Sequence, residues 1–307
     1  MKTVGSGPSM RFPLPTAPAD GPIEQVIRAR SARAGGAHVR RHLPHPLRRM
    51  IGAWCFVDHF GPSPRGAHDV VVGPHPHIGL QTVTWLLSGR IRHRDSLGTD
   101  AVISAGQVNW MTAGWGISHA EDGENDPGEA VHGVQLWVAL PDTHRRMPPA
   151  FHHDPAPTTF SVGAARVTLI VGRMGVHVAS APALSPLLGA DVLLSGAAEL
   201  PLEPHFEYGV VGLEGSVSVG EQSLSAGTSV YLGRGRRSLQ VVGDGRVLLL
   251  GGVPLDEPVL LWWNWVFRAR AEIVQATEQW NAGDARFGVV VGAGGKRIMA
   301  PAVIETD

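Results

Sequence analysis

The chain has 307 residues, of which 43% are hydrophobic, and a formal net charge of −1. A chain of this length can bury one large core or two smaller ones. Its near-zero charge offers no electrostatic footprint for nucleic acid or an anionic membrane surface, so we expect neither as a partner. The single cysteine, Cys55, excludes an intrachain disulfide and fits a reducing, cytoplasmic compartment.

The beginning of the chain predicts a tail followed by strands. Residues 1–20 are rich in Gly, Pro and Ser and lack a continuous apolar run, so we expect a disordered tail rather than a secretory signal. Short alternating runs at residues 23–30 and 38–42 predict strands, and residues 50–60 predict a buried strand that ends at Gly61-Pro62. The 39 glycines and 24 prolines of the chain favour many turns and short strands over helices.

Two pairs of potential metal ligands follow. One residue separates His75 from His77, and one residue separates His119 from Glu121. Alternate side chains of a β-strand share a face, so each pair can point both members the same way. Two such strands facing each other across a small barrel would gather three imidazoles and one carboxylate. That set suits one first-row transition metal and leaves coordination positions open.

The residues between the two pairs favour the barrel over coincidence. With 15 histidines in the chain, a single pair of this spacing could arise by chance. Residues 82–87 are strand-like and stop at Ser88-Gly89, and residues 103–106 predict a turn before a further strand at 108–111. Two pairs separated by strands and glycine turns therefore predict a metal site.

Longer motifs surround these ligands. In order, they are PHPHIGLQTVTWLLSG, HRDSLG, MTAGWGISHAE and HGVQLWVALP. Here, and over nearly the whole chain, the sequence resembles the pirin family of the cupin superfamily, with residues 73–89 and 106–119 as the two cupin motifs. Many cupins place a glutamate ligand where this chain has Gln81. Pirins take their carboxylate from the second motif, so the resemblance assigns it to Glu121 and leaves Gln81 beside the site or in the core.

Other polar residues near these motifs are weaker candidates for a role at the metal site. Asp58 and His59 end a buried strand, and one of them is a candidate hydrogen-bond acceptor for a ligand imidazole. His93 and Asp95 also have i, i+2 spacing. Their expected place at the far end of a long strand from His77 favours a role in fixing a turn, or a place at the surface.

The second half of the chain repeats the pattern of the first with fewer polar groups. After a polar, proline-rich linker at residues 142–158, residues 204–215 echo the first metal segment. His205 and Glu207 could share a face, but the opposing strand offers no imidazole or carboxylate, so we expect no second metal. The repeat predicts an all-β fold of two tandem cupin (jelly-roll type) β-barrels facing each other. The first barrel, residues 21–141, would bind metal, and the second, residues 159–253, would not.

The last segment, residues 254–307, predicts one short helix. Residues 269–283 carry apolar side chains at helical spacing and stop at Gly283. The Trp-Trp-Asn-Trp run at residues 262–265 and the Arg-Phe-Gly at 286–288 resemble the bacterial pirin C-terminus, which packs back on the first barrel. Packing is favoured over a ligand platform for the tryptophans.

The predicted centre restricts the chemistry without naming a substrate. Three histidines and a glutamate with open positions can bind a chelating enolate and dioxygen, or polarise a carbonyl. Several pirins have quercetin 2,3-dioxygenase activity, so the resemblance implies oxidative ring opening of a flavonol. Glu121 is then the candidate base as well as a ligand, although metal-bound water could also take the proton. We expect Fe(II) at the site. Mn, Ni, Cu and Zn are alternatives, because the metal that occupies such a site in the cell depends on which metal is available.

The resemblance also implies a rival function. Pirins act as metal-bearing regulators that bind transcription factors or metabolic enzymes without turnover, and other cupins are sugar isomerases. A roomy apolar pocket lined by residues such as Phe56, Met111 and Trp115 would favour the enzyme and a flavonol-like substrate. A closed metal site under a basic or apolar surface patch would favour the regulator and a protein partner. We expect a monomer in either case.

Overall fold

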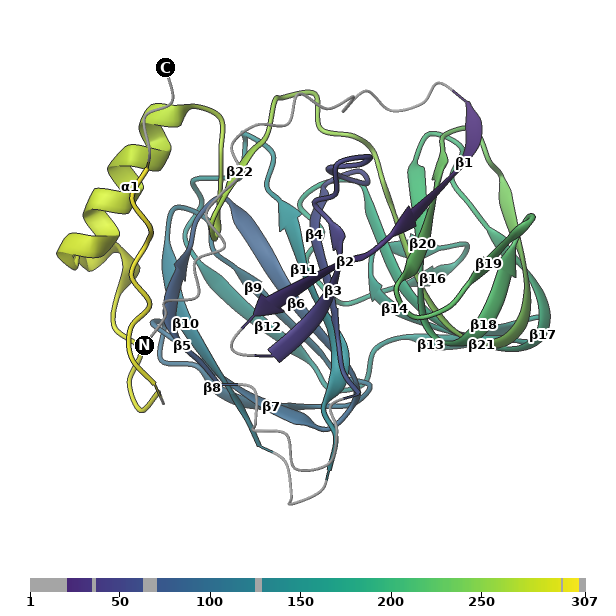
Figure 1. Ribbon diagram of the computed structural model, residues 1–307, viewed down its shortest axis with the longest axis horizontal. Helices are drawn as coiled ribbons and strands as arrows, with labels where there is room; N and C mark the ends of the chain where they lie inside the picture. Colours follow the sequence, from purple (N-terminus) through teal and green to yellow (C-terminus); the bar gives the residue numbers. More distant parts are fainter. Residues whose placement is uncertain (1–20, 35–36, 63–70, 125–128, 294, 304–307) are drawn as a thin grey trace.

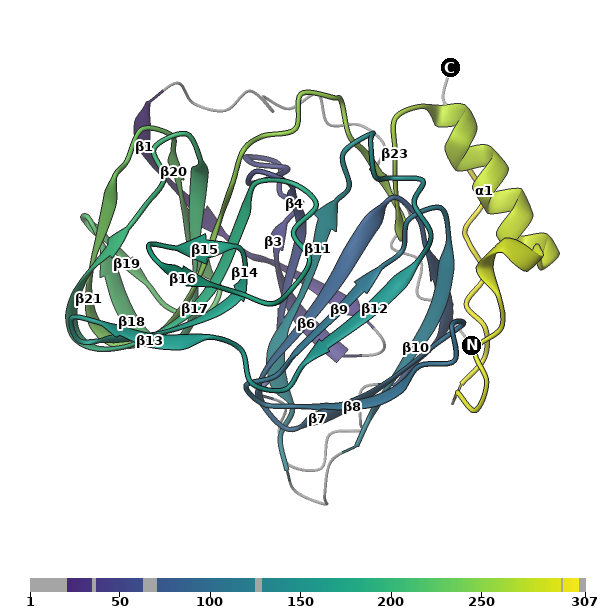
Figure 2. The same cartoon turned by 180° about the vertical axis from the view of Figure 1, so that it is seen from behind.

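Two β-barrels and one α-helix make up the computed structural model, which describes residues 21–34, 37–62, 71–124, 129–293 and 295–303. The helix and the second barrel lie on opposite sides of the first barrel (Figures 1 and 2). The predicted all-β fold of two tandem cupin barrels with a short C-terminal helix is confirmed. The tail expected at residues 1–20 lies outside the described residues.

Two antiparallel sheets form the first barrel. The larger has the order β12-β9-β6-β11-β4-β3-β2, and the smaller has the order β5-β10-β7-β8. Strand β4 is buried along its whole length, as the apolar run at residues 50–60 predicts. The strands are β2 (Arg30–Ala34), β3 (Ala37–Leu43), β4 (Trp54–Phe60), β5 (Val71–His77), β6 (Leu80–Ser88), β7 (Arg90–Asp95), β8 (Asp100–Ser104), β9 (Val108–Thr112), β10 (Ile117–Gly123), β11 (His132–Ala139) and β12 (Ala150–Asp154).

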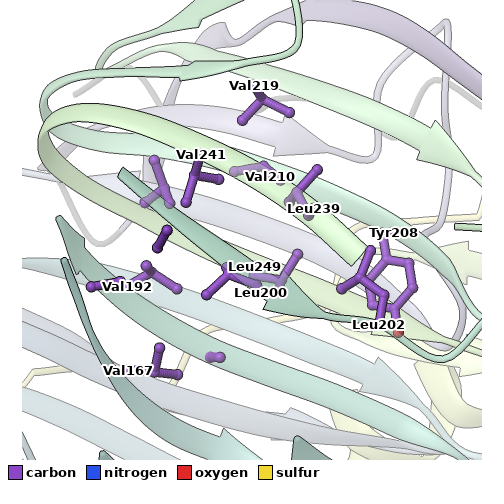
Figure 3. Close-up of a cluster of buried hydrophobic side chains, with 14 of the residues drawn as sticks. Val167, Val192, Leu200, Leu202, Tyr208, Val210, Val219, Leu239, Val241 and Leu249 are labelled. Carbon is purple, nitrogen blue, oxygen red and sulfur yellow. The ribbon is translucent and has the colours of Figure 1, made fainter. Parts of the chain in front are cut away.

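A single sheet of eight strands forms the second barrel, in the order β1-β20-β18-β21-β17-β14-β13 with β19 on β18. Alternating valines and leucines fill its interior, among them Val192, Val210 and Leu249 (Figure 3). Because alternate side chains of a strand point inward, these residues form one continuous core. The strands are β1 (Pro22–Arg28), β13 (Thr159–Val162), β14 (Ala165–Val171), β17 (Leu187–Pro201), β18 (Glu207–Val219), β19 (Gln222–Leu224), β20 (Thr228–Gly233) and β21 (Ser238–Gly252), beside a small ribbon of β15 (Arg173–Met174) and β16 (His177–Val178).

Two strands lie outside the units to which we expected them to belong. Strand β1 falls within residues 21–141, yet it pairs with β20 of the second barrel, with Val26 opposite Val230. Strand β12 falls within the expected linker, residues 142–158, yet it pairs with β9 of the first barrel. An alternating strand shows which face is buried but not which edge it joins, so sequence pattern alone could not assign either strand. The remaining unit boundaries stay a prediction.

The C-terminal segment packs against the first barrel. It comprises the hairpin β22 (Leu260–Trp262) and β23 (Trp265–Phe267), helix α1 (Arg270–Ala282) and the 3-10 turn η1 (Ala285–Phe287). The helix ends at Gly283, whose φ of 81° is left-handed and suits glycine. Ile273 and Trp280 of the helix share an apolar cluster with Ile78. No helix of the described residues is long and apolar enough to cross a membrane.

Candidate metal centre

The candidate ligands lie on the four-stranded sheet, and strand register places them on one face. Strands β5 and β10 are antiparallel, with His75 opposite His119 and His77 opposite Ile117. Residues that lie opposite each other share a face of the sheet, so the three imidazoles project to the same side. The register shifts between His119 and Glu121, where β5 has one more residue than β10 and Glu121 lies opposite Val72.

The imidazoles of His75, His77 and His119 converge. The ring centroid of His75 is 5.1 Å from that of His77 and 4.3 Å from that of His119, and the rings of His77 and His119 are 5.0 Å apart. One donor atom of each residue lies within 4.8 Å of the other two. All three side chains are buried. The structure therefore brings the three predicted histidines into one group of metal-binding size.

Hydrogen bonds at Nδ1 leave Nε2 as the nitrogen for a metal. The Nδ1 of His75 donates to the Gly73 carbonyl at 2.9 Å, and the Nδ1 of His77 donates to the Asn264 carbonyl at 2.9 Å. A carbonyl only accepts, so both rings carry their proton on Nδ1 and keep a lone pair on Nε2. The Nε2 of His119 is buried and has no hydrogen-bond partner within the described part of the chain. Buried polar atoms are normally paired, so this nitrogen beside two other lone pairs fits a bound cation.

The buried surroundings keep these imidazoles neutral. Burial lowers the pKa of His75 to about 4. The pKa values of His77 and His119 are lowered well below the usual value, mainly by burial and to a smaller extent by the neighbouring imidazoles. Neutral imidazole is the form that binds metal, so no proton has to be displaced at physiological pH.

Glu121 lies in a second, overlapping group. One donor atom of Glu121 is within 4.8 Å of donor atoms of His93 and His119. Its Oε1 lies 3.3 Å from the Thr84 hydroxyl oxygen, whose single proton has a nearer acceptor in Gln135 at 2.9 Å. Burial raises the pKa of the Glu121 carboxyl. Among the described residues, no group of this size contains Glu121 together with both His75 and His77.

His93 belongs to this region, and its expected surface position is wrong. Strand β7 pairs with β10 on the side away from β5, which puts Asp95 opposite His119 and His93 opposite Glu121. His93 is buried, with its Nδ1 3.3 Å from the Nδ1 of His119. Asp95 does fix a turn, because its Oδ1 accepts from backbone amides at residues 97 and 99. The i, i+2 spacing of His93 and Asp95 was the only sequence feature that could have pointed to a role at this site. The pairing of β7 with β10 is what places both residues beside His119 and Glu121.

The other candidate partners of the ligands lie in the larger sheet. Asp58 binds Arg41 in a two-point ion pair at 2.8 and 2.6 Å, and His59 contacts His132 at 2.7 Å. Neither hydrogen-bonds a ligand imidazole in the described structure. Gln81 is a core residue, and its Nε2 donates to the Thr112 hydroxyl at 2.9 Å. The Nδ1 atoms of the three candidate ligands instead contact two backbone carbonyls and the Nδ1 of His93.

A cavity of about 610 Å³ opens onto the three imidazoles and Glu121. Phe56 and Trp137 form part of its wall, with ring centroids 4.0 Å apart and planes 14° from parallel. Of the lining residues expected from sequence, only Phe56 lies there. Trp115 lies at the surface with 48% of its area exposed, and Met111 is buried in a separate apolar cluster. Four arginines also line the cavity, namely Arg30, Arg33, Arg41 and Arg49.

The C-terminal hairpin contributes directly to the site. Trp262, Trp263 and Asn264 line the cavity, and the Asn264 carbonyl is the acceptor for His77. Trp263 has a left-handed φ of 50° in the turn between β22 and β23, a conformation unusual for a tryptophan. Trp262 and Trp265 are buried in one apolar cluster, and Trp263 packs against it, while Trp262 and Trp263 also line the cavity.

The second barrel uses its two candidate ligands differently. His205 is exposed, and Glu207 is buried. The Glu207 carboxylate accepts hydrogen bonds from the Gly52 backbone amide and the Tyr231 hydroxyl, both at 2.5 Å. Glu207 therefore joins the two barrels. Both groups of potential metal ligands in the described residues lie in the first barrel.

Comparison with known proteins covers both barrels. A family model described as Pirin matches residues 36–138, and one described as Pirin C-terminal cupin domain matches residues 189–288. A Pseudomonas aeruginosa protein named "Putative quercetin 2,3-dioxygenase" is 46% identical over 287 residues, which span 91% of this chain and 90% of that protein. A pirin-like protein of Caulobacter vibrioides is 37% identical over 272 residues, spanning 85% of this chain and 94% of that protein.

Solved structures share the fold. A quercetin 2,3-dioxygenase from Acinetobacter baumannii is 41% identical, with a TM-score of 0.88 and coverage of 92% of this chain and 97% of the other. A bacterial pirin from Escherichia coli in complex with nickel(II) is 18% identical, with a TM-score of 0.61 and coverage of 76% of this chain and 100% of the other. At that identity the second likeness concerns the fold alone.

Proposed function

The chain belongs to the pirin family, and on that premise we propose that it is a metal-dependent quercetin 2,3-dioxygenase, which opens the ring of a flavonol. The observation that carries the proposal is the large cavity beside the three imidazoles. A regulator whose metal only biases a surface needs no space for a substrate, whereas an enzyme needs a concave site of several hundred cubic ångströms.

The proposed cofactor is one divalent transition metal per chain, with Fe(II) as the first candidate. His75, His77 and His119 would hold it through their Nε2 atoms, and Glu121 would supply the carboxylate. Nitrogen and oxygen ligands without thiolate also suit Mn, Ni, Cu and Zn. When bound, such a metal acidifies a chelating hydroxyl and supplies a centre for dioxygen chemistry.

Glu121 is the proposed base for the flavonol 3-hydroxyl. It lines the same cavity as the three imidazoles, and its carboxylate can accept a proton from a substrate bound there. Loss of that proton gives the chelating 3-oxygen, and positioned bases of this kind accelerate reactions by about 10²–10⁴-fold.

The aromatic wall suits a flat, fused-ring substrate. The Trp137 ring lies 5.0 Å from the His77 ring, so the wall begins next to a proposed ligand. Phe56 stacks on Trp137, and Trp263 adds a third aromatic surface from the C-terminal hairpin. Aromatic faces bind planar rings by offset stacking and exclude water. Arg30 and Arg33 in the lining add positive charge, which attracts a phenolate, whereas the charge of Arg41 is balanced by Asp58.

Aerobic turnover of quercetin by the Fe(II)-loaded protein tests the proposal. We expect loss of the flavonol absorbance together with release of carbon monoxide, and neither in the metal-free protein. The same protein reloaded with Zn(II), which has no redox chemistry, controls for simple binding of quercetin. If iron-replete protein leaves quercetin unchanged in air, the dioxygenase is excluded and the metal-bearing regulator becomes the better account.

A further inference from the structure

The three proposed histidine ligands differ in what holds their Nδ1 atoms. His75 and His77 donate to backbone carbonyls, which are fixed by the fold. The Nδ1 of His119 instead lies 3.3 Å from the Nδ1 of His93, a side-chain nitrogen that can donate or accept depending on the tautomer. The Nε2 of His93 lies 3.3 Å from the Oδ2 of Asp95. A buried chain of three side chains therefore leads from a carboxylate to the unpartnered Nε2 of His119.

The direction of each hydrogen bond in this chain follows from its two ends. A carboxylate accepts, so the Nε2 of His93 carries a proton and donates to Asp95. In neutral His93 the Nδ1 then has only a lone pair, so it accepts a proton from the Nδ1 of His119. That leaves the lone pair of His119 on Nε2, the same arrangement that the two carbonyls impose on His75 and His77.

We propose that His93 and Asp95 are positioning residues that fix the tautomer and ring orientation of His119 for metal binding through Nε2. The proposal rests on the metal centre proposed above and deepens it. Ligating histidines commonly donate their second nitrogen to a carbonyl or a carboxylate, and loss of that partner typically costs about 10–100-fold in metal affinity. Here an imidazole stands between the ligand and the carboxylate.

The surrounding residues hold this chain in place. Asp95 is fixed by its Oδ1, which accepts the backbone amides of Leu97 and Thr99 at 2.9 and 3.1 Å. The His93 ring stacks on Phe151, with centroids 4.8 Å apart and planes 23° from parallel. Both side chains are almost fully buried. The other carboxylate oxygen, Oδ2, lies 3.3 Å from the Nε2 of His93.

Asp95→Asn is the discriminating variant. The amide keeps an oxygen for the two turn amides, so the turn persists, but it presents an NH2 group to His93 where the carboxylate accepted a proton. The Nε2 of His93 must then accept, its Nδ1 must carry the proton, and that proton opposes the one on His119. His93→Leu removes the acceptor for His119 and keeps an apolar contact with Phe151. Asp122→Asn is the matched control. Asp122 also lies on β10, but it pairs with Arg94 at 2.7 Å and takes no part in the hydrogen bonds from Asp95 to His119.

Cobalt(II) is the probe, so that no result depends on quercetin turnover. Chelator competition should give about 10–100-fold weaker cobalt binding for Asp95→Asn and for His93→Leu, and an unchanged value for Asp122→Asn. The double variant should bind no more weakly than His93→Leu, because both changes act through one path. Paramagnetic proton NMR of the cobalt protein should show three solvent-exchangeable ring N–H signals. One of them should broaden in both single variants, which a general loss of packing would not produce selectively.

Other outcomes overturn the proposal. Four exchangeable ring signals would make His93 a direct ligand, as its group with His119 and Glu121 would allow. Unchanged cobalt affinity with all three signals intact in both variants would show that His93 and Asp95 only pack. A wild-type protein that binds no cobalt would remove the metal centre itself, whereas failure of quercetin turnover with normal cobalt binding would affect the proposed function alone.

Discussion

The two barrels share an architecture but differ in what occupies their inward positions. In the first barrel, inward positions of β5 and β10 hold imidazoles beside a cavity of about 610 Å³. In the second, valines and leucines such as Val192 and Leu249 fill the interior (Figure 3). Alternation along a strand only decides which residues face inward. The chemical identity of those residues decides whether a barrel becomes a site or a core.

Polar residues at the interface of the two barrels form buried hydrogen bonds. Glu207, which in sequence echoes the first metal segment, binds the Gly52 amide of the first barrel. The Trp54 indole of the first barrel in turn donates to the carbonyls of Leu188 and Gly251 at 3.1 and 3.2 Å. The second barrel therefore supports the first through buried hydrogen bonds, which fix the orientation of the two barrels.

The largest effect should come from removing two proposed ligands. In His75→Ala with His77→Ala, only His119 and Glu121 remain, too few to hold a divalent ion tightly. We expect bound metal to fall from about one ion per chain to background, with loss of all quercetin turnover. Elemental analysis of the purified protein measures this. Retention of the ion, or two ions per wild-type chain, would contradict the assignment of one site to one barrel.

Glu121→Gln should lower the amount of bound metal only partly but should lower the rate of quercetin turnover strongly. The three histidines still bind some metal, but the amide neither carries a charge nor accepts the proton of the 3-hydroxyl. We expect turnover to fall by about 10²–10⁴-fold at equal metal loading. The absorbance assay reports the rate, and metal analysis of the same sample is the control. Full activity of Glu121→Gln would show that a group other than Glu121 accepts the proton of the 3-hydroxyl.

A core substitution in the second barrel should affect stability but not metal. Leu249 is completely buried in the core of that barrel, so Leu249→Ala loses apolar burial and leaves a cavity. We expect a loss of about 2–5 kcal/mol in the free energy of unfolding, measured by denaturant titration. Metal content per folded chain should not change. A fall in bound metal at temperatures where the variant is folded would show that the second barrel shapes the site.

The smallest effect should come from His205→Ala. His205 is exposed and stands outside both groups of potential ligands. We expect unchanged metal content and a stability change within about 0.5 kcal/mol, as for other surface substitutions. Loss of metal in this variant would show that His205 of the second barrel takes part in metal binding.

Sequence alone predicted much of the fold because its signals are local. Strand alternation, glycine turns and the internal repeat indicated two β-barrels, and helical spacing up to Gly283 indicated α1. The pairs His75–His77 and His119–Glu121 could be found because a period of two fixes which side chains share a strand face. Pairing of β5 with β10 then brings the three histidines together. Their role as ligands, and that of Glu121, stays a prediction.

Tertiary structure decided the features that depend on strand order and on distant segments. The pairing of β7 with β10 buries His93 and Asp95 beside His119, and the return of the C-terminal hairpin brings the Asn264 carbonyl to His77. Strand β1 joins the second barrel for the same kind of reason. A strand's sequence sets its two faces, but its neighbours are chosen by packing over the whole chain, so no local pattern could specify them.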